Sequence, residues 1–142
     1  TEDAMKYLDM AIEREPGNAT YYFAQGTLHE KLGETDEAIV SYEKAIEADN
    51  SFFNAFYNLG ALYYNQGVKQ IEVANSVPTN KNEEYEAELK KADEWFRKAL
   101  PYMERCYQLK PEDTMTKESL KNLYYRLKDM ENYNKMLEEL GQ

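Results

Sequence analysis

One arrangement of small and large side chains occurs several times along this chain at a fixed spacing. It is repeated after 34 residues, and its members are Ala4, Leu8, Ala11 and Pro16, then Ala38, Tyr42, Ala45 and Asn50. A second set keeps this spacing and consists of Tyr22, Gly26, His29 and Gly33, then Phe56, Gly60, Tyr63 and Gly67. A period of about 20–50 residues is typical of chains that stack one small structural unit. Because such a unit cannot bury its apolar face alone, the pattern predicts an array of units.

A third copy follows after a longer interval. Its members stand 61 residues after those of the second copy, and they are Ala99, Met103, Cys106, Pro111, Leu120 and Tyr124. Since 61 is 34 plus 27, we place 27 extra residues between Gly67 and Ala99. The three copies therefore stay in register, and the chain has one large irregularity.

At these positions the sequence resembles the tetratricopeptide-repeat family. The first-helix pattern of that family is clearest at Phe56, Leu59, Gly60 and Tyr63, and the second-helix pattern is clearest at Ala38, Tyr42 and Ala45. The resemblance implies an all-α fold, namely a right-handed α-solenoid of antiparallel helix pairs with about seven helices. The composition also resembles that of bacterial repeat proteins, and we interpret the chain as a fragment of a longer one because it opens at Thr1 directly into a helical pattern.

We expect one repeat domain over residues 1–142. It would consist of a half repeat at 1–18, a repeat at 19–52, a repeat at 53–113 with a helical-hairpin insertion at about 68–94, and a C-terminal repeat at 114–142. Apolar periodicity and turn residues predict the helices themselves at about 2–15, 19–32, 35–48, 53–76, 83–109, 114–128 and 130–140. The C-terminal copy lacks several pattern residues, as the end of an array often does, so we expect Gln142 to lie near the native C-terminus.

The 27 extra residues predict an extended helical hairpin in the third pair. Pro78 marks the turn between its two arms, and Asn82 is expected to cap the second arm. Apolar side chains recur at helical spacing on both arms and can pack together. Gly67 becomes a mid-helix residue, which should cost about 1 kcal/mol relative to alanine. The hairpin is either a tolerated elaboration of a surface turn or an additional contact surface.

Charge and residue types exclude several functions. A net charge of −10 argues against binding of nucleic acid or of an anionic membrane, because both need a basic face. No run of about 18 apolar residues predicts insertion in a membrane. Cys106 is the only cysteine and His29 the only histidine, so neither an intrachain disulfide nor a zinc site built from these residues can form. We therefore predict no catalytic residues, no metal, no cofactor and no enzymatic activity.

The resemblance also implies where a ligand would bind. In the family, the first helix of each pair lines a concave groove, and its exposed residues contact a peptide or partner protein. The corresponding candidates here are Phe23, Thr27, Asn54, Tyr57, Asn58, Ala61, Tyr64, Asn65, Asn122, Tyr125 and Arg126. Tyr and Asn offer rigid aromatic area and amide groups for main-chain hydrogen bonds, although these residues could instead merely solvate a helix face.

Three hypotheses for the function remain at this point. The first is a non-catalytic protein-interaction scaffold that binds a peptide or partner in the groove. The second is a structural module that self-associates through the hairpin and the exposed ends of the solenoid, where Leu8 and Ile12 would be uncovered. The third, remote, is an accessory domain of an enzyme. Both a cytoplasmic and an exported location stay open.

One family sub-class can be tested by residue type. Members that bind the C-terminal carboxylate of chaperones use a clamp of Lys, Asn and Arg. Asn58 matches the Asn position of that clamp, but Phe23, Met115 and Ser119 stand where basic residues belong. The sequence therefore argues against a chaperone clamp.

Overall fold

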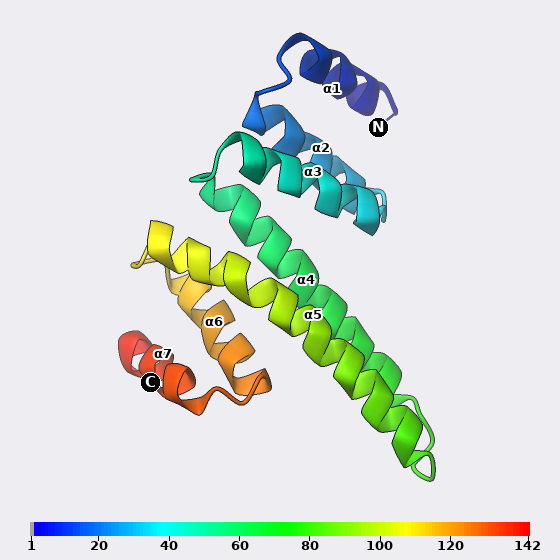
Figure 1. Ribbon diagram of the computed structural model, residues 1–142, viewed down its shortest axis with the longest axis vertical. Coiled ribbons are helices and arrows are strands. Elements are labelled where there is room, and N and C mark those ends of the chain that lie inside the picture. Colours follow the sequence, from blue (N-terminus) through cyan, green and yellow to red (C-terminus); the bar gives the residue numbers. More distant parts are fainter. Residues whose placement is uncertain (1) are drawn as a thin grey trace. The chain divides into compact units, whose positions relative to one another are not determined.

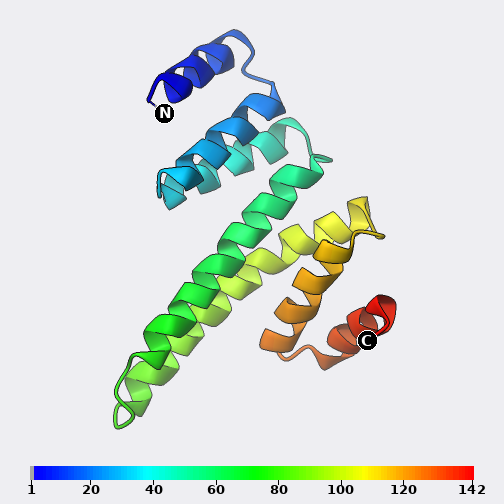
Figure 2. The same ribbon diagram turned by 180° about the vertical axis from the view of Figure 1, so that it is seen from behind.

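The computed structural model describes residues 2–142, and every regular element among them is a helix. The seven helices are α1 (Glu2–Arg14), α2 (Ala19–Lys31), α3 (Thr35–Ala48), α4 (Phe53–Asn75), α5 (Asn82–Leu109), α6 (Thr114–Arg126) and α7 (Met130–Leu140) (Figures 1 and 2). This confirms the expected all-α fold of helix pairs. The observed ends differ from the expected ones by at most two residues, because α6 stops at Arg126 and not at residue 128.

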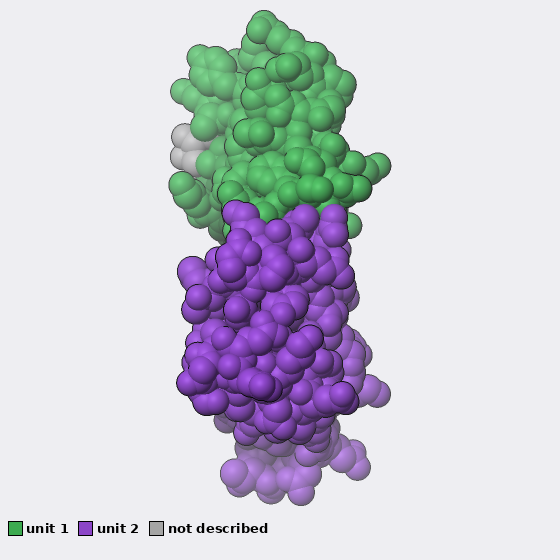
Figure 3. Space-filling model, turned by 90° about the vertical axis from the view of Figure 1, so that its left-hand side faces the viewer, with its two compact units in different colours: residues 1–59 green, residues 60–142 purple. Residues whose placement is uncertain are grey.

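The chain divides into two compact units, Thr1–Leu59 and Gly60–Gln142 (Figure 3). The division falls within α4, which begins in the first unit and continues into the second. Each unit is built from antiparallel helix pairs around its own apolar core.

In the first unit, α2 and α3 form a tight helical hairpin. Ala38, Tyr42 and Ala45 lie on one face of α3 and are all 0% exposed. The ring of Tyr42 packs directly on the backbone of α2 at Gly26, where a Cβ would come within 2.6 Å of it. The turn between the helices uses Gly33 at φ 76°, a left-handed conformation that costs glycine little.

The first helix carries the same pattern without the same burial. Ala4, Leu8 and Ala11 occupy the register of the buried α3 residues, but none of them is buried, and neither is any other residue of α1. In α3 and α5 these positions are covered by a neighbouring first helix. No such first helix covers α1 among residues 2–142, and α2 is the helix with which α1 makes its main contact.

In the second unit, the long helices α4 and α5 run side by side to a shared turn, which gives the expected extended hairpin (Figures 1 and 2). Ala74 on one arm and Ala92 and Phe96 on the other are fully buried. Gln70 also donates a hydrogen bond to Glu88 across the hairpin. Complete burial of a side chain such as Phe96 contributes about 1.5–3 kcal/mol, so the extension carries its own stabilising core.

Two expectations about the hairpin are wrong. Asn82 is the first residue of α5, and Lys81 stands at the N-cap without a side-chain hydrogen bond, so Asn82 does not cap the helix. The expected cost of Gly67 relative to alanine also has the wrong sign. A Cβ at this position would meet the ring of Phe96 at 2.4 Å, so the close contact between the arms requires glycine.

The last two helices close the second unit. Leu120 and Leu123 of α6 and Met136 of α7 are buried together. The turn between these helices contains Lys128 at φ 63°, the one residue other than glycine with a positive φ among residues 2–142. It stands 95 residues after Gly33, in the same register position. The third copy therefore keeps the backbone conformation of the first without its glycine.

Candidate functional site

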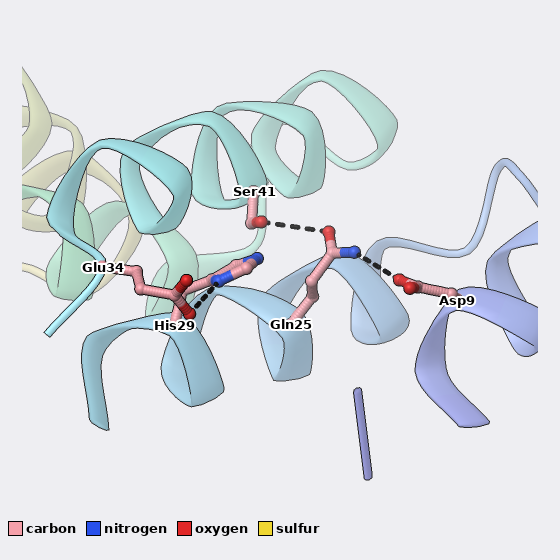
Figure 4. Close-up of polar contacts among 5 residues, drawn as sticks. All are labelled: Asp9, Gln25, His29, Glu34 and Ser41. Atoms are coloured by element: carbon pink, nitrogen blue, oxygen red, sulfur yellow. Dashed lines mark hydrogen bonds and ion pairs between the residues drawn. The ribbon is translucent and has the colours of Figure 1, made fainter. Parts of the chain in front are cut away.

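A chain of polar side chains links α1, α2 and α3 in the first unit. Gln25 of α2 donates a hydrogen bond to Asp9 Oδ1 of α1 at 3.1 Å and accepts one from Ser41 Oγ of α3 at 3.0 Å (Figure 4). In the later copies the register position of Gln25 is occupied by Leu59 and Leu120, which are buried. The first copy therefore attaches α1 with hydrogen bonds where the others use an apolar contact.

A cavity of about 820 Å³ lies between α1 and the C-terminal end of α2. Its lining includes Asp9, His29 and Glu34, and His29 Nδ1 lies 3.2 Å from Glu34 Oε1 (Figure 4). In the third copy the register position of His29 is held by Tyr124, whose hydroxyl donates to Glu104 at 2.8 Å. His29 is shorter than tyrosine and turns to Glu34, so the corresponding space beside α1 stays open.

The candidate residues of the first unit lie on α2 and at the start of α4. Phe23 is half-buried, with its ring centroid 5.1 Å from that of Phe52. Tyr57 stacks on the neighbouring Phe53, and Asn54 is exposed. The other candidates are engaged within the unit: Thr27 donates a hydrogen bond to the Ala24 carbonyl, and Asn58 is hydrogen-bonded to the Tyr42 hydroxyl.

The candidates of the second unit differ in how far they are engaged. Tyr64 lies with its ring centroid 5.4 Å from that of Phe96, and Arg126 Cζ lies 5.0 Å from the same Phe96 centroid. Both are therefore part of the packing between α4, α5 and α6. The remaining members are more accessible: Ala61 is half-buried, and Asn65, Asn122 and Tyr125 are exposed.

On α6, four residues form one outward stripe, which includes the candidates Asn122 and Tyr125. Met115, Glu118, Asn122 and Tyr125 are spaced by three or four residues, so they lie on one side of the helix, opposite the buried Leu120–Tyr124 side. Met115 is 66% exposed and Tyr125 is 60% exposed. We call these four residues the α6 stripe.

A second cavity, of about 700 Å³, was not expected from the sequence. It lies in the second unit, between the extended part of the α4–α5 hairpin and the turn that joins α6 to α7. Its lining includes Leu89 and Lys90 of α5 and Arg126 and Lys128 at the end of α6. We call it the finger cleft. The lysine at a glycine position of the register was the signal in the sequence that could have drawn attention to it.

Burial sets the protonation of two tyrosines and the cysteine. Burial, followed by hydrogen bonds to Glu30 and Glu104, raises the pKa of Tyr42 and of Tyr124 well above the usual value of tyrosine. Burial, with a smaller effect of Asp113, raises the pKa of the Cys106 thiol to about 12. A thiol with so high a pKa is a poor nucleophile, so Cys106 acts as a small apolar residue in the core.

Residues 2–142 lack two kinds of site. No group of three or more His, Cys, Asp or Glu side chains is arranged to hold a metal ion in this range. No helix within it has both the length and the apolar composition that crossing a membrane requires.

The helix pairs match a known family in both sequence and structure. A family model described as TPR repeat matches residues 31–67. Over 62 residues the chain is 40% identical to the small glutamine-rich tetratricopeptide repeat-containing protein 2 of Saccharomyces cerevisiae. The aligned stretch covers 44% of this chain and 18% of that protein. A solved TPR repeats protein of Bacteroides fragilis is 27% identical and superposes with a TM-score of 0.69 over 87% of this chain and 59% of its own. Residues 31–67 thus match a tetratricopeptide repeat (TPR), and the chain as a whole has the helix-pair fold of TPR proteins.

Other TPR proteins are similar over longer stretches. A TPR repeat-containing protein of Methanocaldococcus jannaschii is 31% identical over 90 residues, 63% of this chain and 15% of that protein. The crystal structure of a MamA protein gives a TM-score of 0.68 over 96% of this chain and 62% of its own, at 20% identity, which shows a shared fold. This chain spans less than a fifth of the curated relatives that it matches.

TPR proteins share a general function. TPR folds generally mediate protein–protein interaction, and homologous TPR scaffolds are generally non-catalytic. A fold alone does not name the partner, which depends on the side chains exposed at the surface.

Proposed function

We propose that this chain is a non-catalytic protein-binding module and that the outward faces of α2, α4 and α6 contact a peptide or partner protein. The observation that carries this proposal is the exposure of large apolar side chains on the α6 stripe. Met115 and Tyr125 leave most of their surface in water on a helix whose other side is fully packed. Such side chains supply the apolar area on which most protein interfaces depend.

Polar groups on the same faces complement this apolar area. In the second unit, Asn65 and Asn122 are exposed on the first helices of their pairs. Each carboxamide can donate and accept hydrogen bonds at once, which suits the N–H and C=O groups of a bound peptide backbone. A peptide could therefore be held by tyrosine and methionine contacts and oriented by asparagine side chains.

Selection from a displayed library of random peptides tests this proposal. We expect the chain to select binding peptides, and we expect their amide chemical-shift changes on the ¹⁵N-labelled chain to include the α6 stripe. Met115→Ala and Tyr125→Ala should each weaken the selected peptides by about tenfold, because each removes exposed apolar contact area worth about 1.4 kcal/mol.

Tyr7→Ala is the matched control for Tyr125→Ala. Tyr7 is 70% exposed, lies on α1 in the other unit and has the same side chain. The Tyr7→Ala substitution should leave the affinity for the selected peptides unchanged. A library from which no peptide is selected, or peptides that bind Met115→Ala and Tyr125→Ala as well as the parent, would count against the proposed faces.

A second candidate, self-association, is favoured by the uncovered side of α1. Leu8 stands in the register of Tyr42 and Met103, which are both buried, yet Leu8 is only half-buried and Tyr7 beside it is exposed. A second copy of the chain could cover this side. Light scattering coupled to size exclusion measures the outcome: a dimer that Leu8→Glu turns into a monomer supports self-association, whereas a parent that is monomeric at high concentration excludes it.

A further inference from the structure

The finger cleft exists because of the hairpin extension. Ile71 of α4 and Leu89 and Lys90 of α5 belong to the 27-residue insertion, which a plain repeat lacks. They face the end of α6 and the turn that follows it, which contribute Arg126 and Lys128. The insertion therefore adds one wall to a cavity whose other wall is the C-terminal pair.

The floor of the cleft is apolar and its edge is amphipathic. Ile71, Leu89 and the fully buried Phe96 line the interior. Tyr125 and Met130 stand at the side formed by α6 and α7, and both are exposed. A cavity of about 700 Å³ with such a lining has the size and character of a pocket for one or two apolar side chains of a ligand.

The charges of the cleft are opposite to those of the molecule. The chain carries a net charge of −10, but the cleft contains the cations of Lys90, Arg126 and Lys128 against the carboxylates of Glu86 and Asp93. Within residues 2–142, neither Lys90 nor Lys128 takes part in an ion pair. The cleft thus carries an excess of one positive charge in an acidic chain, and its two lysines are not held in ion pairs, so they can pair with carboxylates of a ligand.

The two walls present their cations in different ways. Arg126 lies over the rings of Phe96 and Tyr64, with Cζ 5.0 Å and 5.9 Å from the two centroids. These contacts hold the guanidinium in place while its N–H groups remain available as donors. Lys128 is carried by a backbone in the left-handed conformation, where Gly33 stands in the first copy. A lysine at such a position costs conformational energy, and strained residues of this kind gather at functional sites.

We infer that the finger cleft binds an acidic segment of a partner protein that carries an apolar side chain. The apolar side chain enters against Ile71 and Leu89, above the buried Phe96, and flanking carboxylates pair with Lys90, Lys128 and Arg126. This inference rests on the proposed protein-binding function and gives it a partner chemistry and a place. It also assigns the hairpin extension a role as a contact surface.

The composition of the peptides selected from the random library tests whether the finger cleft binds an acidic segment. Peptides selected by the parent chain should be enriched in Asp and Glu around one apolar residue. Synthetic versions labelled with fluorescein should bind more weakly as salt is raised, because the contacts are exposed ion pairs. Replacing their acidic residues by amides, or their apolar residue by Ala, should each weaken binding by about tenfold or more.

Lys128→Gly and Lys90→Ala are the decisive variants. Lys128→Gly suits the left-handed backbone, so this variant should fold. Because it lacks the charge of the lysine, it should bind the acidic peptides about tenfold more weakly than the parent chain does. Lys31→Ala is the control: Lys31 is exposed on α2 in the register position of Arg126, in the other unit, and its loss should not change the affinity.

The outcomes separate this inference from the proposed function. Acidic peptides that lose affinity in Lys90→Ala and Lys128→Gly, with shift changes around Leu89 and Lys90, support the finger cleft. Selected peptides that are neutral or basic, or that respond to Met115→Ala and not to Lys90→Ala, overturn the finger cleft but leave the proposed function in place. Failure to select any peptide counts against both. Binding of single-stranded nucleic acid that depends on Lys90 and Lys128 also overturns the inference, because the ligand would then be a phosphate polymer.

Discussion

The ring of Phe96 occupies the space that a side chain on Gly67 would need. A Cβ on Gly67 would lie 2.4 Å from Phe96 Cε1, far inside contact distance. We therefore predict that Gly67→Ala destabilises the chain although it removes a mid-helix glycine. Overpacking costs about 1–3 kcal/mol, which exceeds the gain of about 1 kcal/mol in helix propensity. Denaturant unfolding measures the difference.

Gly60→Ala is the matched control for this prediction. Gly60 lies on the same helix, but there the added Cβ would meet the flexible Met103 side chain at 3.1–3.4 Å. We expect this variant to be equal to or more stable than the parent, because Met103 can shift and the helix gains propensity. Phe96→Leu should reduce the cost of Gly67→Ala. Equal effects of the two glycine substitutions would show that the arms are not in close contact.

Lys128→Gly should stabilise the free chain. Lys128 has φ 63°, and a residue with a Cβ pays about 1–2 kcal/mol in the left-handed region, whereas glycine does not. We expect a gain of about 1 kcal/mol in the free energy of unfolding. Lys128→Ala keeps the strain and should leave stability unchanged, and Gly33→Ala should introduce the same strain in the first unit. A loss of stability in Lys128→Gly would mean that the lysine side chain makes a stabilising contact.

The first helix should be the least protected against hydrogen exchange. No residue of α1 is buried, and a helix of 13 residues is marginal without tertiary packing. Amides of α1 should exchange much faster than those of α3, whose Ala38, Tyr42 and Ala45 are fully buried. Ser41→Ala, which removes one link of the Asp9–Gln25–Ser41 chain, should accelerate exchange in α1 further. Equal protection of both helices would contradict this view of α1.

The fold can be predicted from the sequence because the positions that repeat along the chain are the positions that are buried in the structure. Ala38 and Ala99 are small and Tyr42 and Met103 large at matching positions, so the pattern alone predicts which side of each helix is packed. The extended hairpin could also be predicted from the sequence. Apolar side chains recur at helical spacing on both halves of the 27-residue insertion, and packing the two halves together is the simplest way to bury these side chains. The N-cap of α5 could not be predicted in this way, because a capping residue is assigned correctly only when the start of the helix is known to within one residue.

The candidate site was predicted less completely for a different reason. Register places a residue on a face but does not show which neighbours use its side chain. Asn58 is engaged by the Tyr42 hydroxyl, and Tyr64 by the Phe96 ring, which only three-dimensional packing reveals. The finger cleft joins Leu89 to Lys128, residues from an insertion and a distant turn, and no spacing rule relates them.

Cys106 should resist thiol reagents in the folded chain. It is fully buried, and its pKa is raised to about 12, so only about one thiol in ten thousand is ionised at pH 8. We expect Ellman's reagent to react slowly with the native protein and rapidly after addition of guanidinium chloride. The native rate should rise in Gly67→Ala if that variant opens more often. Fast stoichiometric labelling of the parent would show that the α5–α6 core is accessible.

Two buried tyrosines should make the chain unstable at high pH. Burial and the hydrogen bonds to Glu30 and Glu104 raise the pKa of Tyr42 and Tyr124 above the value near 10 that they regain on unfolding. The folded chain therefore holds these protons more tightly, so their contribution to stability is complete below pH 10 and is lost as pH rises beyond it. Tyr42→Phe should be less stable than the parent by about 1 kcal/mol near pH 8, since it loses the hydrogen bond to Glu30. That gap should narrow steadily above pH 10, and Tyr124→Phe should behave in the same way. Denaturant unfolding at several pH values measures both gaps, and gaps that stay constant to pH 11 would show that neither phenol resists ionisation in the folded chain.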